Sequence, residues 1–134
     1  MPIEGLDHVA ITVSDPERTA SFYADVLGAE VLYLDLWREG KLPVFSLQVG
    51  QSRINVHPAA APASPHATTP LPGSQDLCFR WTGSIGDARQ RLESHGVAIE
   101  LGPEPRPASN GRWGESLYFR DPDGNLLELL TVTP

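Results

Sequence analysis

The sequence predicts an α+β fold built from two successive βαβββ modules. In each half of the chain, short segments that alternate apolar and polar residues surround one helical segment, and the same order of elements occurs twice. Asp7, at the start of the first strand, has a counterpart in Asp76, and Gly28, which ends the first helix, has a counterpart in Gly96. The two offsets, 69 and 68 residues, agree within one residue. A unit of this length that occurs twice indicates duplication rather than a solenoid.

The first module is expected over residues 4–57. Its opening segment, residues 6–13, alternates as a half-buried strand does. A helix should follow, because Asp15 is a helix-capping residue, Pro16 suits the first turn and Gly28 suits the end. Three further apolar stretches, separated by glycines, predict strands at residues 30–34, 44–49 and 53–57.

The second module is expected over residues 75–132, after a connector at residues 58–74 that is rich in proline and alanine. The module begins with a strand at residues 75–81, and its helix at residues 84–95 ends before Gly96. Three further strands are predicted at residues 97–101, 115–120 and 126–131. All 134 residues are expected to form one domain, because a chain of this length can bury an adequate core.

Composition excludes several classes of function. The chain has 17 acidic and 10 basic residues and no cluster of lysine or arginine, so we expect no nucleic acid partner. No apolar run approaches the roughly 18 residues that cross a bilayer, so we expect no membrane partner. The single cysteine, Cys78, cannot form an internal disulfide, and the N-terminus lacks the pattern of a secretory signal. These observations predict a cytoplasmic protein with a small-molecule partner.

Two motifs carry a resemblance to a known family. Residues 5–8 read Gly-Leu-Asp-His, and residues 117–128 read Leu-Tyr-Phe-Arg-Asp-Pro-Asp-Gly-Asn-Leu-Leu-Glu. With the two βαβββ modules, these motifs resemble the vicinal oxygen chelate superfamily of glyoxalases, bleomycin resistance proteins and extradiol dioxygenases, over residues 4–132. Residues 54–57 and 72–79 are similar to its single-domain, glyoxalase-like subgroup. The resemblance implies two curved mixed sheets that form a pair of half-barrels, and a divalent metal bound by the first and last strands of the modules.

The resemblance and the strand alternation together predict a metal site made by His8, His57 and Glu128. Each is expected on the face of its strand opposite the apolar side chains. Two imidazoles and one carboxylate leave open positions on a divalent ion, which suits iron, manganese, nickel or zinc. Glu128 stands among four leucines, where a carboxylate is costly to bury without a cation. His57 is equally compatible with a hydrogen-bonded sheet residue, and the first module's counterpart of Glu128 is either Asn55 or His57.

The chain departs from the family's ligand pattern at the start of the second module. By the 69-residue offset, Leu77 is the counterpart of His8, and leucine cannot bind a metal. Gln75 or Asp76 could compensate for this loss. Asp76 is better explained as the structural counterpart of Asp7, at the start of a strand.

Residues 117–128 also resemble the closing part of the extradiol dioxygenase signature. By this resemblance, Tyr118 and Glu128 are catalytic-site residues: the tyrosine lines the pocket and the glutamate binds the metal. The signature begins with a histidine shortly before this segment, but residues 109–111 are Ser, Asn and Gly. Extradiol ring cleavage is therefore not expected. Tyr118 is equally well explained as an aromatic residue that packs in the sheet.

The sequence therefore predicts a metal-dependent, glyoxalase- or dioxygenase-like enzyme, a lyase or a dioxygenase, that acts on a small molecule with vicinal oxygens. The alternative is a non-catalytic small-molecule-binding protein, like the bleomycin resistance members of the family. His8 and Glu128 favour the enzyme, whereas Leu77 and the missing histidine favour the binding protein. Arg53 and Arg80 are candidates for holding a substrate carboxylate. The resemblance also implies a homodimer.

Overall fold

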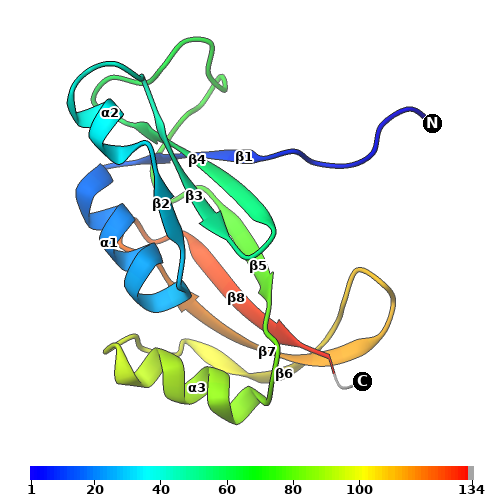
Figure 1. Cartoon of the computed structure of the whole chain (residues 1–134). Coiled ribbons are helices and arrows are strands. Elements are labelled where there is room, and N and C mark those ends of the chain that lie inside the picture. The colour runs from blue at the N-terminus through cyan, green and yellow to red at the C-terminus, as the bar shows by residue number, and fades with distance from the viewer. Residues whose placement is uncertain (133–134) are drawn as a thin grey trace. The chain divides into compact units, whose positions relative to one another are not determined.

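The computed structural model describes residues 1–132 and divides into two compact units at Gly73 and Ser74. Each unit contains one four-stranded mixed sheet, and apart from one short additional helix in unit 1 the strands and helices follow the predicted order of two α+β modules (Figure 1). The predicted fold class is thus confirmed. The connector belongs almost entirely to unit 1. That all 134 residues form one domain stays a prediction, and residues 133 and 134 lie outside the described part.

Unit 1 is a sheet with two helices packed on it, one of them short. Its elements are β1 (Val9–Val13), α1 (Pro16–Leu27), β2 (Glu30–Leu32), α2 (Leu34–Arg38), β3 (Phe45–Val49) and β4 (Ser52–Pro58). The strand order is β1-β4-β3-β2, with β1 parallel to β4 and the other pairs antiparallel. Helix α1 contacts β2, β3 and β4. The side chains between them are fully buried and include Ile11, Val13, Tyr23, Phe45 and Leu47.

Local signals explain α1. The side chain of Asp15 accepts a hydrogen bond from the backbone N–H of Arg18 at 3.1 Å, and Pro16 occupies the first turn. Gly28 ends the helix with φ 67°, a left-handed conformation, and its N–H is bonded to the carbonyl of Tyr23. At 12 residues α1 is the longest helix in residues 1–132, and none of these helices is long and apolar enough to cross a membrane.

The strand predicted at residues 30–34 is wrong at its end: β2 stops at Leu32, and helix α2 begins at Leu34. Asp35 lies in the first turn of α2 and Arg38 in its last turn, so that both charges suit the helix dipole. The guanidinium of Arg38 also donates from Nε to Glu17 of α1 at 2.8 Å and from NH1 to Asp35 at 2.9 Å. Because the contact with Glu17 joins residues distant in sequence, local pattern alone could not predict this short helix.

Unit 2 repeats this arrangement. Its elements are β5 (Asp76–Arg80), α3 (Ile85–Ser94), β6 (Leu101–Pro107), β7 (Trp113–Arg120) and β8 (Leu126–Thr131). The strand order is β5-β8-β7-β6, with β5 parallel to β8. Helix α3 contacts β7 and β8. Its buried residues and their partners in the sheet are Ala88, Leu92, Leu117, Phe119 and Leu127.

The tight turn between β7 and β8 is structural, as its sequence predicts. The carboxylate of Asp121 accepts hydrogen bonds from the backbone N–H groups of Asp123 and Asn125, both at 3.0 Å. The side chain of Asn125 donates to Asp121 at 2.8 Å and accepts from the backbone N–H of Gln75, also at 2.8 Å. This network fixes the turn against the start of β5.

Strand β6 corrects a second prediction. The expected strand was residues 97–101, but β6 begins at Leu101 and runs to Pro107. It includes Pro103 and Pro105. Because β6 is at the edge of the sheet, the missing N–H groups of alternate prolines can face away from β7 at no cost in hydrogen bonds. The prolines also block further strand pairing at this edge.

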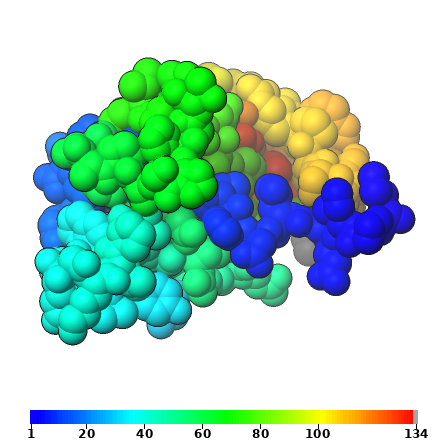
Figure 2. All heavy atoms as spheres, turned by 90° about the horizontal axis from the view of Figure 1, so that it is seen from above, coloured from blue at the N-terminus to red at the C-terminus, as the bar shows by residue number. Residues whose placement is uncertain are grey.

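Residues 1–7 precede β1 as an extended arm, dark blue in Figures 1 and 2. Its two larger aliphatic side chains, Ile3 and Leu6, are 74% and 87% exposed. The predicted first strand, residues 6–13, therefore loses its first three positions. His8 consequently lies just ahead of β1 rather than inside it.

Candidate metal-binding and substrate face

In unit 1, the candidate residues share one face of the β1–β4 pair. Asn55 is paired with Ala10 and His57 with Thr12. The alternate residues of β4, Ile54 and Val56, are 2% and 0% exposed. Asn55 and His57 therefore point away from the core, as the alternation of β4 predicts.

The strand register separates the two histidines. If the pairing of β1 with β4 continues by one residue beyond Val9, His8 lies beside Arg53. This position is four residues before Thr12, the partner of His57. Four residues of strand span about 13 Å, whereas two nitrogens on one ion lie within about 4 Å of each other. Over the described residues, neither unit gathers three metal-binding side chains of its own. That His8 and His57 share an ion stays a prediction, and the register counts against it.

His8 has the partner that metal-binding histidines commonly have. Its Nδ1 lies 2.8 Å from a carboxylate oxygen of Asp7. Because a carboxylate accepts hydrogen bonds, Nδ1 carries the proton and Nε2 keeps its lone pair in the neutral ring. The side chain of His8 is 44% exposed. Its Nε2 can therefore serve as a ligand whose orientation Asp7 holds.

His57 is half-buried, and its Nδ1 is buried without a hydrogen-bond partner among the described residues. Burial lowers the pKa of His57, and the nearby His66 lowers it further. His57 is therefore neutral at pH 7, the form in which an imidazole binds a metal. The Nδ1 of His66 contacts the carbonyl of Ala67 at 2.8 Å.

In unit 2, Glu128 occupies the middle of a polar face. It is paired with Cys78 of β5 on one side and with Tyr118 of β7 on the other. Its neighbours in sequence, Leu127 and Leu129, are 0% and 3% exposed and belong to the opposite, buried face. The predicted alternation of β8 is therefore confirmed.

A buried serine holds the Glu128 carboxylate. The hydroxyl of Ser116, which is fully buried, donates to Oε2 of Glu128. Unit 1 contains the matching pair, in which the Ser46 hydroxyl donates to Oδ1 of Asn55 at 2.7 Å. Asn55, not His57, is therefore the structural counterpart of Glu128. In unit 1 the repeat has an amide where unit 2 has a carboxylate.

The same comparison corrects the counterpart of His8. Leu77 is paired with Leu127 on the buried side of the sheet, whereas Asp76 lies on the side of Glu128. Asp76 lies two residues before Cys78, which is paired with Glu128. In the same way, His8 lies two residues before Ala10, which is paired with Asn55. The equivalent position is thus Asp76, with an offset of 68 rather than 69 residues. Whether Asp76 binds a metal stays a prediction.

Cys78 is held in its neutral form beside Glu128. Desolvation of the thiol and the adjacent Glu128 carboxylate, which accepts its hydrogen bond, raise the pKa of Cys78 to about 12. Asp76 raises it further, and Arg80 opposes the shift. Because the thiolate is the reactive form, Cys78 is a poor nucleophile at pH 7.

Arg106 completes the face and was not predicted from the sequence. Its Nε donates to the hydroxyl of Tyr118 at 2.8 Å, and its guanidinium carbon lies 5.4 Å from the centre of the Tyr118 ring. Of the predicted arginines, Arg53 instead donates to Gln48 at 2.8 Å, and Arg80 is exposed. The signal for Arg106 was the alternation of proline and charged residues in β6.

A sequence model of the glyoxalase/bleomycin resistance protein/dioxygenase superfamily matches residues 5–129. The chain belongs to this superfamily. Glyoxalase domain-containing protein RDO1 of Mycosarcoma maydis is 39% identical over 96% of this chain and 69% of the relative. Virulence protein STM3117 of Salmonella typhimurium is 37% identical over 96% of this chain and 85% of the relative. The crystal structure of STM3117 has a TM-score of 0.88 and covers 99% of this chain and 100% of that chain.

A less similar solved structure shares the fold. The structure of a mutant fosfomycin resistance protein FosX from Listeria monocytogenes has a TM-score of 0.65 and 23% identity, and covers 98% of this chain and 92% of that chain. Its crystals contain Mn(II) and 1S,2S-dihydroxypropylphosphonic acid.

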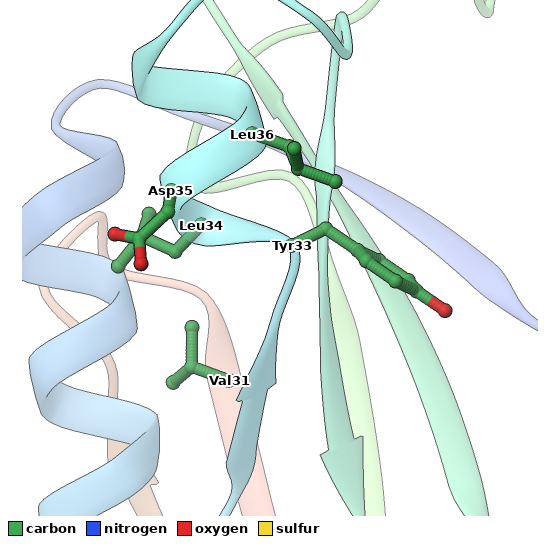
Figure 3. Close-up of a pocket in the computed structure, with 5 residues that line it drawn as sticks. All are labelled: Val31, Tyr33, Leu34, Asp35 and Leu36. Carbon is green, nitrogen blue, oxygen red and sulfur yellow. The ribbon is translucent and has the colours of Figure 1, made fainter.

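Unit 1 of this superfamily member also contains an open pocket of about 400 Å³ that none of the candidate residues lines. It is lined by Val31, Tyr33, Leu34, Asp35 and Leu36, at the junction of β2 and α2. Figure 3 shows the Tyr33 ring directed away from Val31 and Leu34. The pocket is open, and its one charged lining residue, Asp35, is paired with Arg38. We assign no site to it.

Proposed function

We propose that this protein is a metal-dependent, glyoxalase- or dioxygenase-like enzyme that acts on a small molecule with vicinal oxygens. His8 and Glu128 are proposed as metal ligands, and Tyr118 as a residue of the substrate site. The observation that carries the proposal is that both ligands have a dedicated polar partner: His8 has Asp7, and Glu128 has Ser116. Such partners orient ligands at metal sites.

The donor set fits a divalent ion. Nε2 of His8 is available, and the Glu128 carboxylate, which accepts hydrogen bonds from Ser116 and Cys78, has further lone pairs for a cation. Nitrogen and carboxylate donors suit iron, manganese, nickel and zinc. The Mn(II) in the distant FosX structure supports the same choice. A divalent ion, when bound, polarises vicinal oxygens as a Lewis acid.

Two residues of β4, His57 and Asn55, are candidates for the third ligand. The sequence favours His57, which is neutral and has a buried, unpartnered Nδ1. The repeat favours Asn55, the counterpart of Glu128. His57→Ala and Asn55→Ala variants separate the two, because only loss of a true ligand weakens metal binding while the fold is retained.

Tyr118 can contribute a proton donor. Its oxygen accepts a hydrogen bond from Arg106, so that its own O–H is available to a bound substrate. Tyr118 is paired across the strands with Glu128, which places the hydroxyl on the face of the proposed ligand.

Metal analysis of protein purified without chelator tests the proposal. After incubation with Mn(II), Fe(II), Ni(II) or Zn(II) and dialysis, the wild type should retain about one ion per chain. His8→Ala and Glu128→Gln should retain far less, whereas His95→Ala, which removes an exposed histidine at the end of α3, should match the wild type. A wild type that retains no ion would refute the metal-dependent function and favour a non-catalytic binding protein. Turnover of methylglyoxal with glutathione should be absent or poor.

A further inference from the structure

Arg106 is a half-buried cation without an acidic partner. It forms no ion pair within the described chain, although the protein carries seven more acidic than basic residues. Its guanidinium donates to the Tyr118 hydroxyl and to the carbonyl of Pro105, both neutral oxygens. Five N–H groups are available on arginine, so donors remain free on the side of Tyr118.

A β-bulge directs Arg106 to this face. Leu101 is paired with Tyr118 and Glu104 with Ser116, so that β6 advances three residues while β7 advances two. The extra residue reverses the alternation of β6. Arg106 therefore shares the face of Tyr118, where an unbulged strand would have placed Pro105.

Gly102 makes the bulge possible. Its φ is +122°, and a Cβ at this position would lie 2.4 Å from the backbone oxygen of Ser116. Only glycine fits such a close approach. The strand is thus shaped locally in a way that brings an unpaired arginine beside Tyr118, one strand away from Glu128.

We propose that Arg106 binds an anionic group of the substrate, a carboxylate or a phosphonate, and that Tyr118 fixes the orientation of its guanidinium. The proposal rests on the proposed metal-dependent function and names its substrate class: a small anion that also carries vicinal oxygens. A planar guanidinium binds two oxygens of such a group at once. Glu104 shares the face, but no ion pair within the described chain joins it to Arg106.

Two matched probes test the proposal by calorimetry. Catechol and 3,4-dihydroxybenzoate both carry vicinal oxygens, and only the second carries a carboxylate. The Mn(II)-loaded wild type should bind 3,4-dihydroxybenzoate about tenfold more tightly than catechol, the effect of one charge-assisted hydrogen-bonded pair. Arg106→Gln should reduce this preference to less than about twofold.

Two further variants control for folding and for charge. Arg106→Met keeps the apolar stem against Tyr118 and should lose the preference as Arg106→Gln does. Arg112→Gln removes an exposed charge from the same β6–β7 hairpin and should keep the preference. A preference that survives both Arg106 variants, or that Arg112→Gln removes equally, would overturn the proposal.

A metal-free arm separates this inference from the proposed function. Inorganic phosphate should bind the chelator-treated wild type, and Arg106→Gln should weaken this binding at least about fivefold. If Mn(II) does not bind but this phosphate effect is found, the proposed function fails and the role of Arg106 stands. If Mn(II) binds and neither phosphate nor 3,4-dihydroxybenzoate depends on Arg106, the role of Arg106 is refuted alone.

Discussion

At the scale of single residues, the candidate face depends on partners that hold reactive groups in one state. Ser116 holds one oxygen of Glu128, and Asp7 fixes the proton of His8 on Nδ1. Desolvation of the thiol, together with the Glu128 carboxylate, in turn keeps Cys78 protonated. Each of these arrangements can be tested by changing the partner rather than the group itself.

Loss of the Ser116 hydroxyl should weaken the site without removing a ligand. In Ser116→Ala, a half-buried carboxylate oxygen loses its donor, which should cost about 1–3 kcal/mol in the free energy of unfolding. Mn(II) affinity should fall roughly 10- to 100-fold, as it does when an outer partner of a metal ligand is lost. Urea denaturation and metal titration measure the two effects. Ser109→Ala, in the exposed β6–β7 loop, is the control, and equal effects in both variants would contradict the role of Ser116.

Cys78 should be unreactive until high pH. Its pKa in the folded protein is raised to about 12 from an ordinary value of 9.0, so that this group stabilises the fold below pH 9 and loses that contribution as pH rises through 12. Because the residue is exposed, its thiolate fraction, not access, limits alkylation. At pH 8, iodoacetamide should react roughly a thousandfold more slowly than with the urea-unfolded chain. Equal rates would contradict the raised pKa.

The sequence predicted the strand face of Glu128 better than the surroundings of that face. The orientation of Glu128 follows from strict alternation among leucines, which one sequence displays. Arg106 escaped prediction because its face depends on a bulge, and a bulge is set by the pairing of β6 with β7. The counterpart of His8 was placed one residue too far, at Leu77, because a repeat offset alone does not give strand register.

At the scale of elements, predictions succeeded where local chemistry determines the structure. Helix α1 and the β7–β8 turn have their capping and turn residues in sequence, and both formed as expected. Helix α2 and strand β6 did not. The first depends on the contact of Arg38 with Glu17, and the second on an edge position that tolerates alternate prolines.

Gly102→Ala should damage β6 severely. A Cβ at this position would lie 2.4 Å from the Ser116 oxygen and 3.1 Å from the Leu117 Cα, both backbone atoms that cannot move aside easily. With the strain of a positive φ, the variant should lose about 2–4 kcal/mol of unfolding free energy. Gly111→Ala is the matched control, since its φ is also positive, at +82°, but a Cβ there meets nothing within 4 Å. Its loss should be about 1 kcal/mol, and equal losses by urea denaturation would contradict the close-approach argument.

At the scale of the whole molecule, duplication explains both the fold and the asymmetry of the site. Each unit has the same strand order and the same serine-held side chain, but unit 1 has Asn55 where unit 2 has Glu128. Only the second unit thus carries a charged side chain at this position. The cytoplasmic location and the homodimer stay predictions.

The most direct test of the account is calorimetric titration of Mn(II) into chelator-treated wild type and Glu128→Gln. The substitution keeps the shape of the side chain and its contact with Ser116 but removes the charge that binds a cation. The account predicts about one ion per chain in the wild type and an affinity at least about 100-fold weaker in the variant. A wild type that binds no Mn(II), or a variant that binds it equally tightly, would contradict the central claim.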